Sequence, residues 1–172
     1  MRTAKFKLTE ETIVVNGKTL YRIEALRDFA NVKKGDKGGF VEKEDNLSQI
    51  GDCWICGNAK VYDDAEVYGN AKVYDDAFVY DDAVVCGSAD INGNAQVNGR
   101  AMVYDNAEVY GNAEVCDNAE VCDNAEVFDN AVIYGKARVY GNAIVCDKAE
   151  VCGYSKIYGN AIIRGNTKVC DE

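Results

Sequence analysis

Apolar residues recur every six positions from Cys53 to the last residue. This segment divides into twenty hexads without insertion or deletion, such as AKVYDD and AEVYGN; the third slot is always Val or Ile, and the first is Ala in seventeen hexads. Residues two apart in a strand face the same side, so the Ala and Val point inward and the second and fourth slots point outward. The fifth slot is always Gly or Asp and the sixth is mostly Asn, which are turn residues. Each hexad therefore predicts a strand of about four residues and a corner.

A single short strand cannot bury its apolar side alone, so successive turns of the chain must stack and share one core. With three hexads per turn, the twenty hexads give about 6.7 coils and a rod of roughly 32 Å at a strand spacing of ~4.8 Å. We predict an all-β fold: a single-stranded triangular β-helix over residues 53–172.

Residues 1–52 lack the repeat and are expected to form an N-terminal β-hairpin capping module. Strands are expected at Lys5–Leu8 and Ile13–Ile23, with a tight turn at Asn16-Gly17. We expect strand structure to be interrupted before Phe40 by three glycines, Gly35, Gly38 and Gly39. Trp54, in an outward slot of the first hexad, is expected to pack under the hairpin, and the module would protect the open edge of the first coil.

The hexads resemble the hexapeptide-repeat left-handed β-helix superfamily, in which an aliphatic residue is followed by a small residue four positions later. Val61 with Ala65 and Val67 with Ala71 fit that pattern. The resemblance implies a left-handed helix. The slot after the aliphatic residue differs from the family pattern, because it holds Tyr68 or Cys86 where Gly, Ala, Glu or Asp is usual. A triangular right-handed helix like that of the bactofilins is therefore the alternative.

Residues 20–55 resemble the N-terminal module of the YdcK-like putative transferases and related phage or prophage hexapeptide-repeat proteins. The shared stretches are V-K-x-G-x-x-G-G-F-V, here Val32–Val41, and N-L-S-x-x-G-D-C-W, here Asn46–Trp54. This resemblance implies a phage-type or prophage-type protein. It implies no activity, since "transferase" in that group follows from the fold, and function depends on a site.

Composition narrows the classes of function. The chain has a formal net charge of −10, and an acidic body repels phosphate backbones, so direct nucleic-acid binding is not expected. No apolar run is long enough for a membrane span or a signal peptide, which makes a cytoplasmic protein the default expectation. The chain has no His and no convergent ligand pattern, so neither a metal nor a cofactor is expected.

Catalysis is not expected either. Hexapeptide-repeat acyltransferases, which this chain resembles in its repeat, generally use a His base and a loop thrown out from the helix, and both are missing here. Seven of the eight Cys occupy the outward fourth slot, where no His can activate them. Only Cys152 and Cys170 lie eighteen residues apart, which places them on adjacent coils within disulfide reach.

Two candidate interaction surfaces remain. Residues eighteen apart share a column, so the first surface combines exposed aromatic, thioether and acidic positions: Tyr68, Tyr104, Tyr140, Tyr158, Met102, Asp63, Asp64, Asp81 and Asp82. The second is the last coil, where the repeat stays in phase to the end of the chain. Its apolar residues, Ile157, Ile163 and Val169, are the expected interface of an end-to-end homodimer or a partner complex.

The leading hypothesis is a non-catalytic protein-binding or scaffold rod, a phage or prophage accessory protein. Its concrete form is an acidic inhibitor of a host nucleic-acid-handling or defence factor, with rows of carboxylates competing for a basic groove. The alternatives are an acyltransferase-like enzyme or its degenerate relative, and a purely structural assembly subunit.

Overall fold

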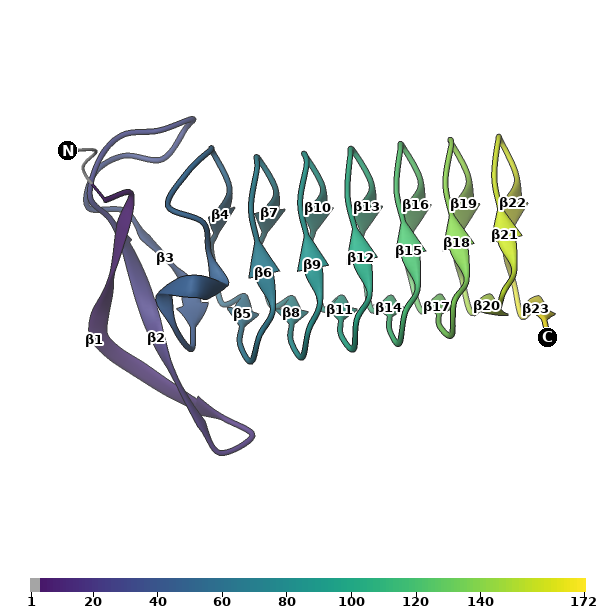
Figure 1. Cartoon of the computed structure of the whole chain (residues 1–172), viewed down its shortest axis with the longest axis horizontal. Helices are drawn as coiled ribbons and strands as arrows, with labels where there is room; N and C mark the ends of the chain where they lie inside the picture. The colour runs from purple at the N-terminus through teal and green to yellow at the C-terminus, as the bar shows by residue number, and fades with distance from the viewer. Residues whose placement is uncertain (1–3) are drawn as a thin grey trace.

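The six-residue period becomes one side of a triangular turn in the computed structural model, which describes residues 4–172 (Figure 1). Each outward or inward residue pairs with the residue eighteen positions later, as Met102 pairs with Glu120 and Val103 with Val121. Three hexads therefore make one turn, and the chain builds three parallel sheets from stacked turns. The prediction of an all-β triangular β-helix is confirmed.

The three sheets contain six, seven and ten strands. The six-stranded sheet consists of β6 (Glu66–Val67), β9 (Val84–Val85), β12 (Met102–Val103), β15 (Glu120–Val121), β18 (Arg138–Val139) and β21 (Lys156–Ile157). The seven-stranded sheet consists of β4 (Trp54–Ile55), β7 (Lys72–Val73), β10 (Asp90–Ile91), β13 (Glu108–Val109), β16 (Glu126–Val127), β19 (Ile144–Val145) and β22 (Ile162–Ile163).

The ten-stranded sheet joins the N-terminal module to the rod. Its strands are β1 (Phe6–Val15), β2 (Lys18–Ala25), β3 (Lys37–Val41), β5 (Lys60–Val61), β8 (Phe78–Val79), β11 (Gln96–Val97), β14 (Glu114–Val115), β17 (Val132–Ile133), β20 (Glu150–Gly153) and β23 (Lys168–Asp171). A short 3₁₀ helix, η1 (Glu44–Asn46), follows β3.

The rod winds in the left-handed sense. In Figure 1 the N-terminal module lies on the left, and the strands of the six-stranded sheet face the viewer and run upward. The chain then passes behind the rod through the seven-stranded sheet before it returns to the front one turn to the right. The chain thus rises at the front, crosses to the back at the top, and advances to the right with each turn. A helix with this sense of rotation is left-handed.

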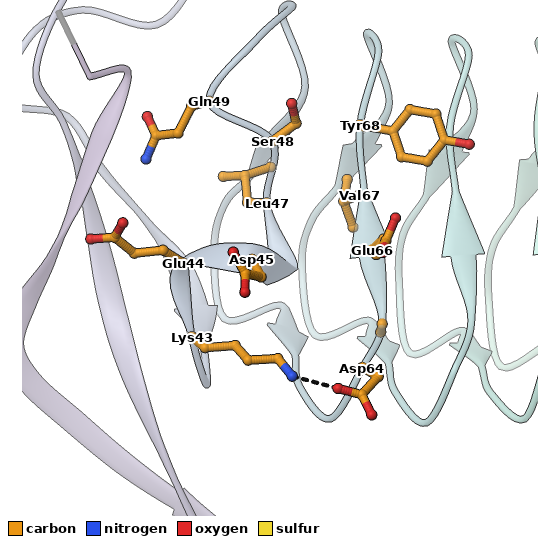
Figure 2. A pocket seen from close by; sticks show the side chains of 11 residues that line it. Lys43, Glu44, Asp45, Leu47, Ser48, Gln49, Asp64, Glu66, Val67 and Tyr68 are labelled. Atoms are coloured by element: carbon orange, nitrogen blue, oxygen red, sulfur yellow. Dashed lines mark hydrogen bonds and ion pairs between the residues drawn. The ribbon is translucent and has the colours of Figure 1, made fainter.

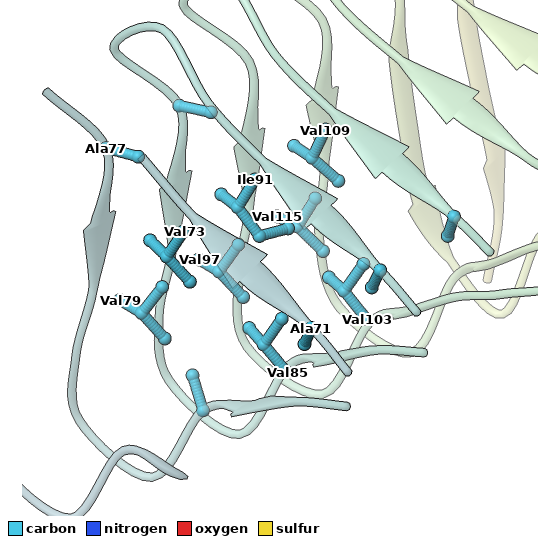
Figure 3. Packing of buried hydrophobic residues seen from close by; sticks show 14 of the residues in the cluster. Ala71, Val73, Ala77, Val79, Val85, Ile91, Val97, Val103, Val109 and Val115 are labelled. Carbon is cyan, nitrogen blue, oxygen red and sulfur yellow. The ribbon is translucent and has the colours of Figure 1, made fainter. Parts of the chain in front are cut away.

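The core is a column of Val, Ile and Ala side chains that runs along the axis (Figure 3). Val73, Val85 and Val97 come from the three different sheets and are fully buried, as are the Ala residues beside them. The small Ala leaves room for the branched Val in a narrow interior, where a larger side chain would overpack. The inward assignment of both slots is thus confirmed.

The strands are shorter than expected, since nearly all contain two residues where about four were predicted. The reason lies at the corners. The fifth-slot residue adopts a left-handed backbone, with φ of 59° at Asp81 and 65° at Gly99, so the strand ends there at every corner. Asp and Gly alternate in this slot because both tolerate that conformation.

The N-terminal module contains the predicted hairpin, whose turn residues Asn16 and Gly17 have φ of 50° and 80°. Strand β2 then pairs antiparallel with β3, and β3 pairs parallel with β5, with Phe40 opposite Lys60. The backbone ladder of the rod therefore continues across residue 52 into the module.

The expected interruption of strand structure at Gly38 and Gly39 is wrong, because both lie within β3 and are buried. A Cβ on Gly38 would lie 2.4 Å from the Ile23 side chain, and one on Gly39 would lie 2.6 Å from the Ala59 carbonyl oxygen. These glycines therefore serve the close approach of β3 to its neighbours rather than a turn.

The hairpin packs over the outward side of the first turns of the rod, on the part of the ten-stranded sheet that follows β3. Leu20, Phe40 and Tyr62 form a small second core there. Trp54 is buried, but its partner is Phe29 in the loop between β2 and β3, with ring centroids 5.3 Å apart. The expectation that Trp54 packs under the hairpin is therefore wrong, because Trp54 packs against the β2–β3 loop instead. The loop covers the first strand of the seven-stranded sheet.

Candidate binding surface

Neither the N-terminal hairpin nor the β2–β3 loop covers the outward side of the six-stranded sheet, whereas they cover the first turns of the other two sheets. This outward side carries two columns, one in the second slot and one in the fourth slot of its hexads. We call this surface the tyrosine face. Its second-slot column is Glu66, Val84, Met102, Glu120, Arg138 and Lys156, and its fourth-slot column is Tyr68, Cys86, Tyr104, Cys122, Tyr140 and Tyr158.

Exposed apolar side chains are spread over the whole length of the tyrosine face. Tyr68 is 40% exposed, Met102 38% and Tyr158 60%. Tyr104 and Tyr140 are half-buried, because neighbours one turn away cover part of each ring. Tyr140 stacks on Tyr158, with centroids 5.5 Å apart and planes inclined by 16°. The structure thus brings all five predicted apolar candidates onto one flat sheet side.

The polar groups of the face are ordered by contacts between turns. Arg138 Nε donates to Glu120 Oε2 at 2.9 Å, and the Tyr104 hydroxyl approaches the same oxygen at 3.5 Å. The side chains of Glu66 at one end and of Lys156 at the other make no hydrogen bond or ion pair within residues 4–172. The face therefore has an unpaired carboxylate at its N-terminal end and an unpaired ammonium at its C-terminal end.

Tyr68 and Tyr104 of this face stay uncharged at neutral pH. The contact with the Cys86 thiol, together with burial, raises the pKa of Tyr68 to about 12, and the contact with the Cys122 thiol and burial do the same for Tyr104. Phenols with such pKa values present an apolar ring and a hydrogen-bond donor. That combination suits a docking surface that is apolar in its body and polar at its edge.

The four predicted acidic candidates line the corner that leads into the tyrosine face, but the chain itself engages them. Asp63 is paired with Lys18 and Asp64 with Lys43, both from the N-terminal module. Asp82 lies 3.7 Å from Arg100, and Asp81 Oδ2 accepts a hydrogen bond from the Gly99 N–H at 3.0 Å. This corner consequently offers less unpaired negative charge than the sequence alone suggests.

A groove of about 780 Å³ lies at the N-terminal end of the tyrosine face, between η1 and β6 (Figure 2). It exists because η1 stands where a regular strand would otherwise pair with β6, and only Leu47, just after η1, forms a bridge to Val67. Its lining combines Ser48, Gln49, Glu66 and Tyr68 with the Lys43–Asp64 ion pair. Sequence reasoning missed this groove, since no residue of the repeat signals where the regular sheet stops.

The outward side of the seven-stranded sheet has a different character, and we call it the acidic face. Asp90, Glu108 and Glu126 occupy three successive turns in direct register. Tyr110 stacks on Phe128 with centroids 4.8 Å apart, and its hydroxyl lies 3.3 Å from Glu126. Carboxylates in register, rather than the predicted Asp63 to Asp82 set, form the continuous acidic column of the rod.

The predicted oligomer end lies in the last turn. Ile157 is buried, Ile163 and Val169 are half-buried, and the neighbouring Ile162 is 58% exposed. Cys152 and Cys170 lie on paired strands with Cα atoms 4.6 Å apart and form a disulfide, in agreement with the prediction for this pair. The disulfide ties β20 to β23.

Several thiols in the fourth slot of the rod have raised pKa values. Burial raises the pKa of Cys116 to about 12 and raises the pKa values of Cys122 and Cys146. Thiols with raised pKa values remain protonated and unreactive at neutral pH.

Among residues 4–172, no three Cys, Asp or Glu side chains converge in a way that could hold a metal ion. Within the same residues, the structure has no helix able to span a bilayer. A scan against protein-family models finds no model that matches this chain, and no curated protein matches it.

Proposed function

We propose that this chain is a non-catalytic binding rod that docks a protein through its tyrosine face. The observation that supports this most directly is the exposure of Tyr68, Met102 and Tyr158 along one uncovered, regular sheet side. Tyr and Met are enriched at protein interfaces, and Tyr is frequent among the residues that dominate binding energy. The rigid turns hold these side chains in place before binding, which lowers the entropy cost of docking.

The absence of a His base and the raised thiol pKa values support a non-catalytic protein over an acyltransferase-like enzyme. A carboxylate would need desolvation to act as a base at neutral pH. The corner carboxylates are instead exposed or paired with Lys or Arg, as Asp64 is with Lys43. These features favour a non-catalytic role for the chain.

The finer identity that we propose is a member of the hexapeptide-repeat superfamily, related to the YdcK-like and phage or prophage proteins, that works in the cytoplasm. Its support is the resemblance of Val32–Val41 and Asn46–Trp54 to that group. The left-handed winding is consistent with such a membership (Figure 1).

We further propose that the acidic face provides the second contact, with a basic protein that handles nucleic acid. Asp90, Glu108 and Glu126 repeat at the strand spacing of ~4.8 Å along a rigid axis. Such a row can compete with a phosphate backbone for a basic groove, while the net charge of −10 disfavours nucleic acid itself. An inhibitor of a host defence or nucleic-acid-processing factor is the concrete version.

The predicted end-to-end contact of Ile157, Ile163 and Val169 is the competing docking site. Its support is the exposure of Ile162 next to half-buried Ile163. The tyrosine face extends over six turns, whereas this end offers the area of one turn. We therefore place the main interface on the tyrosine face.

Site-specific photo-crosslinking inside cells of the source organism tests the proposal. A photoreactive side chain is placed in turn at Met102 on the tyrosine face, at Glu108 on the acidic face and at Ile162 on the last turn. We expect protein adducts from position 102, and mass spectrometry then identifies what is bound. Adducts from position 162 alone, or no adduct from position 102 at native expression, would contradict the proposed docking surface.

A further inference from the structure

The order of residues along the tyrosine face can be tested for complementarity with the same face of a second copy. A two-fold axis parallel to the strands places two such faces against each other with the rods antiparallel, so that the first turn of one copy meets the sixth turn of the other. In this arrangement second-slot residues face second-slot residues, and fourth-slot residues face fourth-slot residues. Each column can therefore be compared with its own reverse.

The fourth-slot column is complementary in size to its reverse. Its sequence from β6 to β21 is Tyr68, Cys86, Tyr104, Cys122, Tyr140 and Tyr158. Reversal places Tyr104 opposite Cys122 and Tyr140 opposite Cys86, so a large side chain meets a small one at the four central turns. Interdigitation of this kind is what allows two sheets to pack at ~10 Å. Only the end turns bring Tyr68 against Tyr158.

When the second-slot columns of two antiparallel copies face each other, opposite charges meet at the two end turns. Glu66 at the first turn meets Lys156 at the sixth, and both side chains are exposed and without a partner within residues 4–172. The charge of Glu120 is already balanced within the chain by Arg138, at 2.9 Å. At the remaining turns Val84 lies opposite Arg138 and Met102 lies opposite Glu120, so the apolar residues face the Glu120–Arg138 ion pair of the other copy. An antiparallel pair therefore contains two Glu66–Lys156 contacts, one at each end.

We propose that the occupant of the tyrosine face is a second copy of this chain, docked antiparallel about a two-fold axis parallel to the strands. Such an isologous contact is the commonest kind in homodimers. It buries the exposed Tyr and Met side chains and turns the acidic face of each copy outward, where both remain available to a basic partner. This inference rests on the proposed docking role of the face.

The expected affinity is modest. Six strands at ~4.8 Å and a width of roughly five residues give an area of about 450 Å² per copy. This lies at the small end of specific interfaces, and the net charge of −10 on each copy opposes association. We therefore expect a weak dimer whose population depends on concentration.

A charge-swap experiment with intact chains tests the two-fold contact. Lys156→Glu creates two like-charge contacts in its own dimer, and so does Glu66→Lys. A mixture of the two variants restores opposite charges at both contacts, because each copy supplies what the other lacks. Glu66 and Lys156 are five turns apart in one chain, or about 24 Å, so such a rescue must occur between copies.

Sedimentation velocity over a range of concentrations measures the outcome. We expect the parent to dimerise, each single variant to dissociate about tenfold more readily, and the equimolar mixture to recover the parent behaviour. Ile162→Asp, on the last turn, is the control and should dimerise like the parent. Circular dichroism checks that all variants keep the fold.

Three results would overturn the inference: a parent that stays monomeric at high concentration, single variants that dimerise like the parent, or a mixture without rescue. Loss of dimerisation in Ile162→Asp alone would assign association to the last turn. If the parent is monomeric while position 102 still crosslinks to another protein, the second copy is the wrong occupant and the proposed function stands. If position 102 crosslinks to nothing, both fail.

Discussion

The regular turns and the N-terminal module satisfy backbone hydrogen bonds in two different ways. Within the rod, each strand donates its N–H groups to carbonyls one turn later, as Tyr104 donates to Val121 at 3.0 Å. At β6 this ladder reaches its first strand, and the Asn46 side-chain amide donates to the carbonyls of Ala65 at 2.9 Å and Asp63 at 3.0 Å. The buried Asn46 side chain there supplies donors that a strand would supply elsewhere, beside a single backbone bridge between Leu47 and Val67.

The first strand of the seven-stranded sheet is closed in a similar manner by Lys5. This residue is fully buried, and its ammonium donates to the Cys53 carbonyl at 2.9 Å and contacts the Cys53 sulfur at 3.1 Å. At these two sheets the module closes the rod mainly through single side chains, whereas at the ten-stranded sheet β3 continues the backbone ladder. Buried polar groups must be paired, so the module has little tolerance for changes at these two positions.

The largest expected effect comes from a charged residue in the buried third slot of the rod. Val109 is fully buried in the third slot, so Val109→Asp places an unpaired charge in a dry core, at a cost of several kcal/mol. We expect loss of the fold in thermal melts followed by circular dichroism. Glu108→Ala, on the outward neighbour, is the matched control and should melt close to the parent; similar melting of Val109→Asp would contradict the inward assignment.

The next largest effect breaks the closure by the module. Asn46→Asp removes the amide donor and turns a carboxylate toward the carbonyl oxygens of Ala65 and Asp63, which leaves them buried without a partner. We expect a loss of about 2–4 kcal/mol in the free energy of unfolding, measured by denaturant titration. Asn58→Asp, at an exposed corner, is the control; an equal loss in both variants would argue against the closing role of Asn46.

A smaller effect sharpens the comparison at the corners. Asp81 Oδ2 accepts a hydrogen bond from the Gly99 N–H of the next turn, whereas Asp105 lies below Asp123 and makes no such bond within the described residues. Both have a left-handed backbone, with φ of 59° and 58°. Asp81→Ala should therefore cost about 0.5–1.5 kcal/mol more than Asp105→Ala. Equal costs in denaturant titrations would show that backbone conformation alone selects Asp.

The smallest effect concerns proton binding by the tyrosines of the rod. Burial raises the pKa values of Tyr80 and Tyr110 from the usual 10.0 to about 12. The folded chain then holds more protons than the unfolded chain between these pH values. Stability that is fully present below pH 10 should fall as pH rises through about 12.

Ultraviolet absorbance of the ionised phenols measures this directly in the native and the denatured protein. A native titration curve that coincides with the denatured one would contradict the raised pKa values, and so would a melting temperature that does not fall above pH 10.

The hexads made the rod predictable because every slot has one physical role. Val in the third slot and Ala in the first fixed the core, and Gly or Asp in the fifth fixed the corner, so the triangular turn and the disulfide pair Cys152 and Cys170 followed from a spacing of eighteen. Strand length was overestimated, because the left-handed corner residue ends each strand early. The repeat contains no signal for that geometry beyond the residue type.

The module was predictable only where a local signal exists, as at Asn16-Gly17. Gly38 and Gly39 suggested a turn, but they serve a close approach that depends on Ile23 and Ala59. For the same reason the pairing of Asp63 with Lys18 and of Asp64 with Lys43 was missed, since it depends on how the module packs on the rod. The tyrosine column was predicted from spacing, whereas its uncovered state depends on that packing.

Hydroxyl-radical footprinting tests most directly whether the tyrosine face is the working surface. The oxidation of individual side chains is compared between the dilute protein and the protein at a high concentration, in the absence of any other protein. We expect protection of Tyr68, Met102 and Tyr158, with Tyr74 on the acidic face and Ile162 on the last turn unchanged. Unchanged oxidation of Met102 together with protection of Ile162 or Tyr74 would contradict it.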